Sequence, residues 1–123
     1  MSIINTKRLC QIAESEFSDI VVDAISSDLN ETRIIFSDNS FLDIWFSLKL
    51  EGRYSFHWER RAIDGKIFRH DNAPHQRWLN TSTFPKHYHD GSEEKVVASI
   101  ISDDPEQALR EFLSFVRQYL TNL

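Results

Sequence analysis

The sequence predicts an α+β domain in which about five antiparallel strands lie between an N-terminal and a C-terminal helix. Two observations indicate this fold class: helical periodicity is confined to the ends of the chain, and period-two alternation fills the middle. A third is that no helix separates successive strands, which argues against a doubly wound parallel sheet. The length of 123 residues and the 41% apolar content suit a single domain over residues 1–123 with one core.

Both ends of the chain carry helix signals. In DDPEQALREFLSFVRQYL, Asp104 is placed to cap a helix, Pro105 takes its first position and Gln107 takes the capping-box position. The apolar face of this helix comprises Leu109, Phe112, Leu113, Val116, Tyr119 and Leu120. Near the start of the chain, Asn5 is predicted to cap a shorter helix. The buried stripe of that helix comprises Leu9, Ile12 and Ala13.

Between the helices the sequence alternates as strands do. IVVDAI and TRIIF are predicted strands, SDNS is a turn, and KVVASI is the last strand. FLDIWFSL is a strand whose shared face comprises Leu42, Ile44, Phe46 and Leu48. RYSFHWERR alternates most clearly, because Tyr54, Phe56 and Trp58 point one way while Ser55, His57 and Glu59 point the other. We therefore expect one face of the sheet to be polar.

The pair Asp64-Gly65 predicts a hairpin between Tyr54–Glu59 and Lys66–Asp71, because Asp followed by Gly tolerates the positive φ angles of a tight turn. A two-residue loop would place on one face His57, Glu59, His70 and Asn72.

Charge is unevenly distributed along the chain, whose net charge is −5. Residues 53–91 hold seven basic and four acidic side chains (+3), whereas the remainder holds seven basic and fifteen acidic ones (−8). All five histidines lie in the basic part. A basic centre in an acidic shell is suited to a phosphate-bearing ligand, and ordinary unevenness of surface charge is the alternative.

Export and membrane signals are missing from the sequence. No apolar run exceeds three residues, so neither a signal peptide nor a membrane span is indicated. Cys10 is the single cysteine and cannot form an internal disulfide, which fits a reducing compartment, and we interpret it as a packing residue. A cytoplasmic protein without a membrane partner is the expectation.

The stretch FRHDNAPHQRWLNTSTFPKHYHDG, residues 68–91, holds four of the five histidines and two of the three prolines. Long connections of this kind are often functional. Pro74 and Pro85 each bend the chain shortly before a histidine group, which positions these side chains at an edge of the sheet. We therefore expect His75, His87 and Arg69 to converge on one concave surface. Lys86 is expected at its rim.

The segments YSFHWERRAIDGKIFRHDNAPH and TFPKHYHDG resemble the TumE-type toxins of prokaryotic toxin–antitoxin modules. The motifs cover residues 54–91, and the whole chain agrees in length and order of elements. The resemblance implies the toxin of a type II module, a cytoplasmic protein that a partner antitoxin neutralises and that acts on RNA or on translation at the ribosome. The positions that mark the family are Asp71, Asn72, Pro74, His75, Pro85, His87 and His89.

The residue types in these motifs suit metal-independent RNA cleavage, and hence an endoribonuclease without a cofactor. Such cleavage needs a base for the ribose 2′-hydroxyl, an acid for the leaving 5′-oxygen and a cation for the phosphate. His75 and His87 are the candidate acid and base, with Arg69 and Lys86 as cations. The candidate substrate-binding residues are His57, Asp71, Asn72, Trp78, Tyr88 and His89. Of these, Trp78 or Tyr88 would stack a base.

Two other readings remain open. His87 and His89 on an extended segment project to one side and, with His75 or Asp71, supply the three ligands of a hydrolase-like site for zinc or another divalent metal. Alternatively, the chain is a non-enzymatic module whose histidine-rich loop contacts a protein partner. The tryptophans that would then serve as core or interface anchors are Trp45, Trp58 and Trp78.

Overall fold

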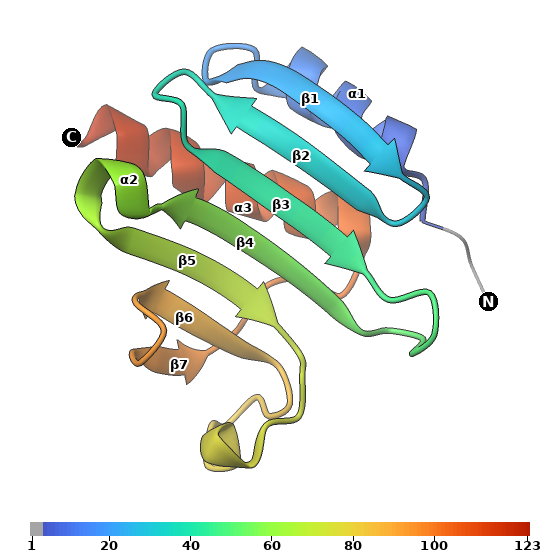
Figure 1. Cartoon of the computed structure of the whole chain (residues 1–123), viewed down its shortest axis with the longest axis vertical. Coiled ribbons are helices and arrows are strands. Elements are labelled where there is room, and N and C mark those ends of the chain that lie inside the picture. The colour runs from blue at the N-terminus through green and yellow to red at the C-terminus, as the bar shows by residue number, and fades with distance from the viewer. Residues whose placement is uncertain (1–3) are drawn as a thin grey trace.

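The computed structural model describes residues 4–123 and confirms the α+β fold (Figure 1). Within these residues, seven strands form one antiparallel sheet in which every strand pairs with the next along the chain. The strands are β1 Val21–Asp28, β2 Glu31–Phe36, β3 Phe41–Phe46, β4 Tyr54–Arg60, β5 Lys66–Asp71, β6 His87–Gly91 and β7 Val96–Ala98. The helices are α1 Thr6–Glu16, the single turns α2 Arg61–Asp64 and η1 Gln76–Trp78, and α3 Pro105–Thr121.

Both predicted helix caps are present. The Asn5 side chain accepts from the Arg8 N–H (3.0 Å), and the Asp104 side chain accepts from the Gln107 N–H (3.0 Å). Only this half of the capping box forms at α3, since the Gln107 side chain donates to Glu111 instead. The expected stripe of α1 is buried, as is Cys10. No helix in residues 4–123 has the length and apolar character needed to cross a membrane.

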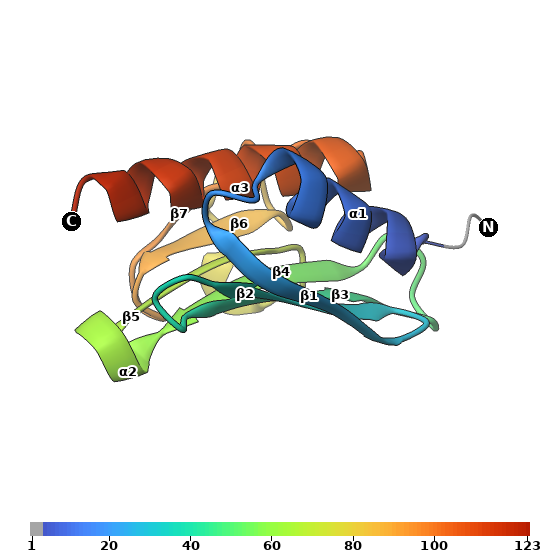
Figure 2. The same ribbon diagram turned by 90° about the horizontal axis from the view of Figure 1, so that it is seen from above.

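The two long helices lie on the same face of the sheet (Figure 2). Alternate residues of the central strands point toward them and form the core, because burying these apolar side chains removes their surface from water. Trp58 on β4 is fully buried and packs edge-on against Phe115 and Tyr119 of α3. Phe56 stacks on Phe112 of the same helix. The opposite face of the sheet, which carries the polar members of the alternation, has neither long helix over it (Figure 2).

The predicted hairpin between β4 and β5 is confirmed, but its turn and register differ from the prediction. The connection is the helical turn α2 followed by Gly65. The φ of Gly65 is +78°, in the left-handed region that glycine adopts without steric cost. The buried Arg60 guanidinium binds Asp38 (2.6 Å) and Asp64 (3.0 Å), which holds the chain in this turn. His70 therefore stands opposite Phe56 and faces the helices, so its predicted place beside His57 is wrong.

Two other strands differ from the prediction. Strand β6 was expected to be part of a loop, and it pairs with both β5 and β7. Its buried side chains are the imidazoles of His87 and His89, so the strand lacks the alternation of apolar and polar residues that marks a half-buried strand. Leu48 does not continue the buried face of β3: the strand ends at Phe46, and Leu48 is exposed.

Candidate functional site

A row of ionisable side chains crosses the face of the sheet that lies away from α1 and α3. On five neighbouring strands, each member stands directly opposite the next. The row runs Arg33, Asp43, His57, Arg69 and His89. Asp71 and His87 form a second cross-strand pair, two residues away from Arg69 on β5 and from His89 on β6. We call this side of the sheet the polar face. Within this row no two residues of like charge stand directly opposite each other.

Arg69 is the centre of the polar face. Its Nε donates to Asp71 Oδ2 (3.0 Å), and its terminal nitrogens reach Glu93, His57 Nδ1 (3.2 Å) and His89 Nε2 (3.3 Å). Burial opposes the charged form of Arg69, but the hydrogen bonds that it donates to Glu93 and Asp71 outweigh this effect and raise the pKa of the guanidinium. The same pairing lowers the pKa of Glu93. The charge of Arg69 is therefore neutralised by Asp71 and Glu93, and its hydrogen bonds orient the neighbouring side chains.

His57 continues this network toward the end of β4. Since its Nδ1 accepts from Arg69, its Nε2 carries the proton and donates to Glu59 Oε1 (3.1 Å). Arg61 also hydrogen-bonds Glu59, and this bond lowers the pKa of that carboxyl to about 2. His57 is therefore held in one orientation by a guanidinium on one side and a carboxylate on the other.

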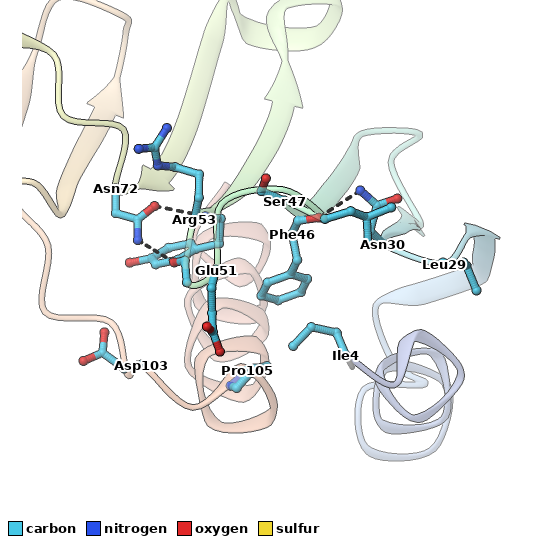
Figure 3. Close-up of a pocket in the computed structure, with 13 residues that line it drawn as sticks. Ile4, Leu29, Asn30, Phe46, Ser47, Glu51, Arg53, Asn72, Asp103 and Pro105 are labelled. Carbon is cyan, nitrogen blue, oxygen red and sulfur yellow. Dashed lines mark hydrogen bonds between the residues drawn. The ribbon is translucent and has the colours of Figure 1, made fainter. Parts of the chain in front are cut away.

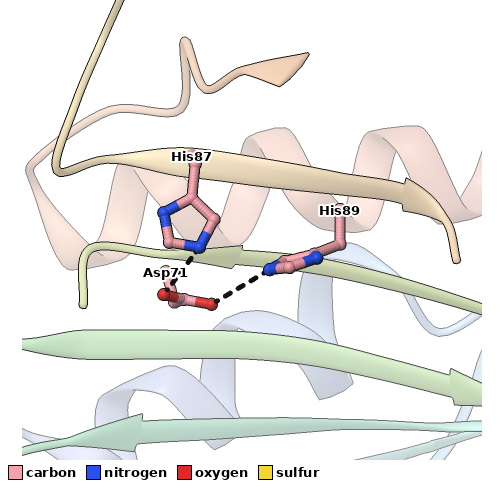
Figure 4. A group of neighbouring side chains, drawn as sticks. All are labelled: Asp71, His87 and His89. Carbon is pink, nitrogen blue, oxygen red and sulfur yellow. Dashed lines mark ion pairs between the residues drawn. The ribbon is translucent and has the colours of Figure 1, made fainter. Parts of the chain in front are cut away.

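Asp71, His87 and His89 converge behind Arg69, and all three are buried (Figure 4). The Nε2 atoms of His87 and His89 lie 3.1 Å and 3.7 Å from the two carboxylate oxygens of Asp71. Each histidine places Nδ1 against a backbone carbonyl, of Pro85 (2.8 Å) and of Glu93 (3.0 Å) respectively. A carbonyl oxygen only accepts, so each of the two histidines carries a proton on Nδ1. Burial, and then the charge of Arg69, lowers the pKa of His89.

An open cavity of about 410 Å³ lies over this cluster, and we call it the loop pocket. It is lined by Arg69, Asp71, His75, Arg77, Trp78, His89 and Glu93. The connection from β5 to β6 forms its outer wall, because η1 brings Trp78 over His87 and His89, with ring centroids 6.1 Å and 5.8 Å apart. Arg77 lies over the Trp78 ring at 4.7 Å. The pocket therefore joins a buried cluster to exposed side chains of the loop.

The structure brings together some of the predicted catalytic residues and separates others. His75 and Arg69 both line the loop pocket. His87 has no exposed surface and lies beneath Trp78 instead of lining the pocket. Lys86 is not at the rim, because its Nζ donates to the Ile101 carbonyl and pairs with Asp103 (3.2 Å).

The predicted substrate-binding residues also divide. Those that line the loop pocket are Asp71, Trp78 and His89. Tyr88 faces the helices and stacks on His70 with centroids 4.2 Å apart, and burial raises its pKa. Arg77 and Glu93 were not anticipated; the position of Arg77 between the two histidine motifs was the one signal that could have indicated it.

Asn72 has a structural position at a different cavity, beside the loop between β3 and β4 (Figure 3). Its side chain accepts from the Tyr54 N–H (3.0 Å) and donates to the Gly52 carbonyl (2.7 Å). It thereby ties the end of β5 to the β3–β4 loop. Most of the lining of this cavity is apolar or uncharged, and none of it is histidine.

The fold and the site define a small α+β protein with a histidine-rich cluster on the open face of a meander sheet. The family model described as Toxin TumE matches residues 7–120, and the chain belongs to this toxin family. Membership of a toxin family implies an antitoxin as partner. No curated protein and no solved structure matches the chain.

Proposed function

We propose that the chain is the toxin of a type II toxin–antitoxin module and that it acts on RNA at the loop pocket. One observation carries this proposal: an exposed imidazole, a guanidinium and an indole meet at one open pocket on the polar face, contributed by His75, Arg77 and Trp78. Membership of the TumE family supplies the toxin class. The chemistry of the pocket supports RNA as the target, because these three groups suit a proton transfer, a phosphate and a base.

Arg77 and Trp78 are suited to hold a nucleotide. Within residues 4–123, Arg77 makes no ion pair, so its guanidinium is available to a phosphate in a way that Arg69 is not. Trp78 is half-buried and offers an aromatic surface for a base. A local phosphate contact of this kind is compatible with a net charge of −5, since it requires only a small basic patch.

Metal-independent cleavage needs an acid and a base on opposite sides of the phosphate, and the pocket offers His75 and Glu93. In this scheme the Glu93 carboxylate turns from its ion pair with Arg69 and takes the proton of the 2′-hydroxyl as the hydroxyl oxygen bonds to phosphorus. His75 protonates the 5′-oxygen as the P–O bond breaks, which leaves a 2′,3′-cyclic phosphate and a 5′-hydroxyl. His87 is enclosed beneath Trp78, so we assign it no part in the proton transfer, in contrast to the expectation from the sequence.

The test is purified protein incubated with RNA, followed by mapping of the new ends. Wild type should generate 2′,3′-cyclic phosphate ends, and His75→Gln and Glu93→Gln should each slow their formation by about 10²–10⁴-fold. Glu94→Gln is the matched control, since Glu94 adjoins Glu93 in sequence, is exposed and does not line the pocket. If cells expressing the toxin stop growing while their RNA stays intact, RNA is not the target.

A further inference from the structure

We infer that Asp71, His87 and His89 form a binding site for one divalent transition-metal ion, with zinc as the first candidate (Figure 4). Each residue offers one ligand atom, and these atoms all lie within 4.8 Å of one another. Two neutral imidazole nitrogens and a carboxylate oxygen form a donor set that suits zinc and its neighbours better than magnesium or calcium, which prefer oxygen alone.

The backbone already orients both histidines as metal ligands are oriented. Nδ1 of His87 donates to the Pro85 carbonyl, and Nδ1 of His89 donates to the Glu93 carbonyl. These bonds fix the tautomer, so that the lone pair of each Nε2 points into the cluster. Asp71 is oriented in the same way, since its Oδ1 accepts from the Ala73 N–H (3.1 Å). Hydrogen bonds of this kind orient the ligands and raise the basicity of the imidazoles.

His87 provides an independent observation. Its side chain is fully buried, and its Nε2 makes no hydrogen bond even though Asp71 Oδ1 lies 3.1 Å away. With its only proton on Nδ1, the imidazole turns a nitrogen lone pair toward a negatively charged oxygen, and a buried polar atom without a partner is unfavourable. A cation between the two atoms removes both unfavourable features. A second proton on His87 is the competing explanation, and the metal content of the protein distinguishes the two.

The position of the cluster gives the ion access to a ligand. Asp71 and His89 line the loop pocket as well as the cluster, so an ion with three protein ligands would have its fourth position toward the pocket. Arg69 makes two bonds to the cluster, from Nη2 to His89 Nε2 (3.3 Å) and from Nε to Asp71 Oδ2 (3.0 Å). It would have to release the first, whereas the second can stay if Asp71 binds the ion through Oδ1, which lies 3.1 Å from His87 Nε2. The contacts of Arg69 to Glu93 and His57 do not involve the cluster.

The role of the ion, although not its binding, rests on the proposed function. An ion at the floor of the loop pocket would hold a phosphate oxygen or a water molecule beside His75. RNA cleavage would then depend on the ion, in place of the metal-independent scheme.

Metal content tests the inference. Protein without a histidine tag, purified without chelators, should hold about one ion per chain by plasma mass spectrometry. Asp71→Asn and His89→Gln should lose it, whereas His75→Gln should keep it, because His75 lies outside the cluster. Since buried substitutions can prevent folding, the wild type is also depleted with a chelator and reloaded with zinc or cobalt. Zinc should raise its melting temperature, and cobalt should give the visible absorption of a low-coordinate site, with neither effect in folded His89→Gln.

Two results would overturn the site: wild type that neither holds metal nor responds to zinc or cobalt, or His89→Gln that binds as wild type does. The outcome for the proposed function is separate. A metal-depleted wild type that cleaves RNA as fast as the loaded protein overturns the role of the ion in cleavage and leaves the RNA activity standing. A loaded wild type that leaves RNA intact supports the ion site and overturns the RNA activity.

Discussion

The two faces of the sheet use the same strands for different purposes. On the helix face, Phe56, Trp58 and Phe68 pack against the aromatic side of α3. On the polar face, one residue away along the same strands, His57 and Arg69 belong to a network of charges. The first face is buried by apolar contact. The second is buried in part only, beneath the loop that carries Trp78, and its polar groups are satisfied mainly by one another.

This difference between the two faces indicates that the helix face provides most of the stability and the polar face provides the groups for activity. Apolar burial stabilises the fold in proportion to the area removed from water, so the helix face should dominate the free energy of unfolding. Charged groups repay their desolvation only where they are paired, so the polar face should contribute less to stability. In return it places titratable and ligand-binding groups beside an open pocket. Variants that alter one face at a time test this separation.

Trp58→Ala should lower the free energy of unfolding by about 3–5 kcal/mol, because it empties a fully buried site between the sheet and α3. Trp45→Ala is the matched control, since Trp45 is also on a central strand but lies on the polar face and is half-buried. Urea denaturation of both variants measures the difference. Equal losses would contradict the separation of the two faces.

Arg69→Met should cost about 2 kcal/mol, because it leaves Asp71 with one fewer donor and removes the cation that Glu93 and the histidines share. Arg33→Met is the control from the same cross-strand row. Its pair with Asp43 is exposed, so we expect a loss of under about 1 kcal/mol. The two urea midpoints should differ accordingly; if Arg33→Met costs as much, burial beneath the loop does not strengthen the network.

Glu59 should make stability depend on pH in acid. Its pKa is lowered from 4.5 to about 2, chiefly by the hydrogen bond from Arg61, so its contribution is present above pH 4.5 and is lost as the pH falls toward 2. Because its side chain is 21% exposed, we expect on the order of 1 kcal/mol. Between pH 6 and about pH 3, the free energy of unfolding of Glu59→Gln should fall less steeply than that of wild type. Parallel curves would show that Glu59 is not held as a carboxylate by Arg61 and His57.

The sequence was sufficient to predict most of the fold. Caps at Asn5 and Asp104, apolar periodicity and the alternation around Trp58 are local signals, and each is confirmed. Strand β6 and the turn α2 were not predictable in this way. The first buries imidazoles where strands usually bury apolar groups, and the second depends on a contact of Arg60 with Asp38, far away in the sequence.

The candidate site was predicted in part, for the same reason. Of the residues expected at one surface, His75 and Arg69 line the loop pocket, whereas His87 and Lys86 do not. The burial of His87 depends on Trp78 folding over it, and the direction of Lys86 depends on the backbone at Ile101. Both are tertiary contacts that no local pattern encodes. The family, in contrast, was recognisable from its two motifs, and the family model over residues 7–120 confirms it.

The most direct test of the central claim measures toxicity and folding in the same variant. The double variant His75→Gln/Arg77→Gln changes two exposed side chains of the loop pocket, and Lys49→Gln changes an exposed cation outside it. Each is expressed without an antitoxin, surviving colonies are counted, and the melting temperature of the purified protein is compared with that of wild type. The account predicts that wild type and Lys49→Gln arrest growth, whereas the double variant melts as wild type does and permits growth. A folded double variant that arrests growth as fully as wild type would contradict the assignment of activity to the loop pocket.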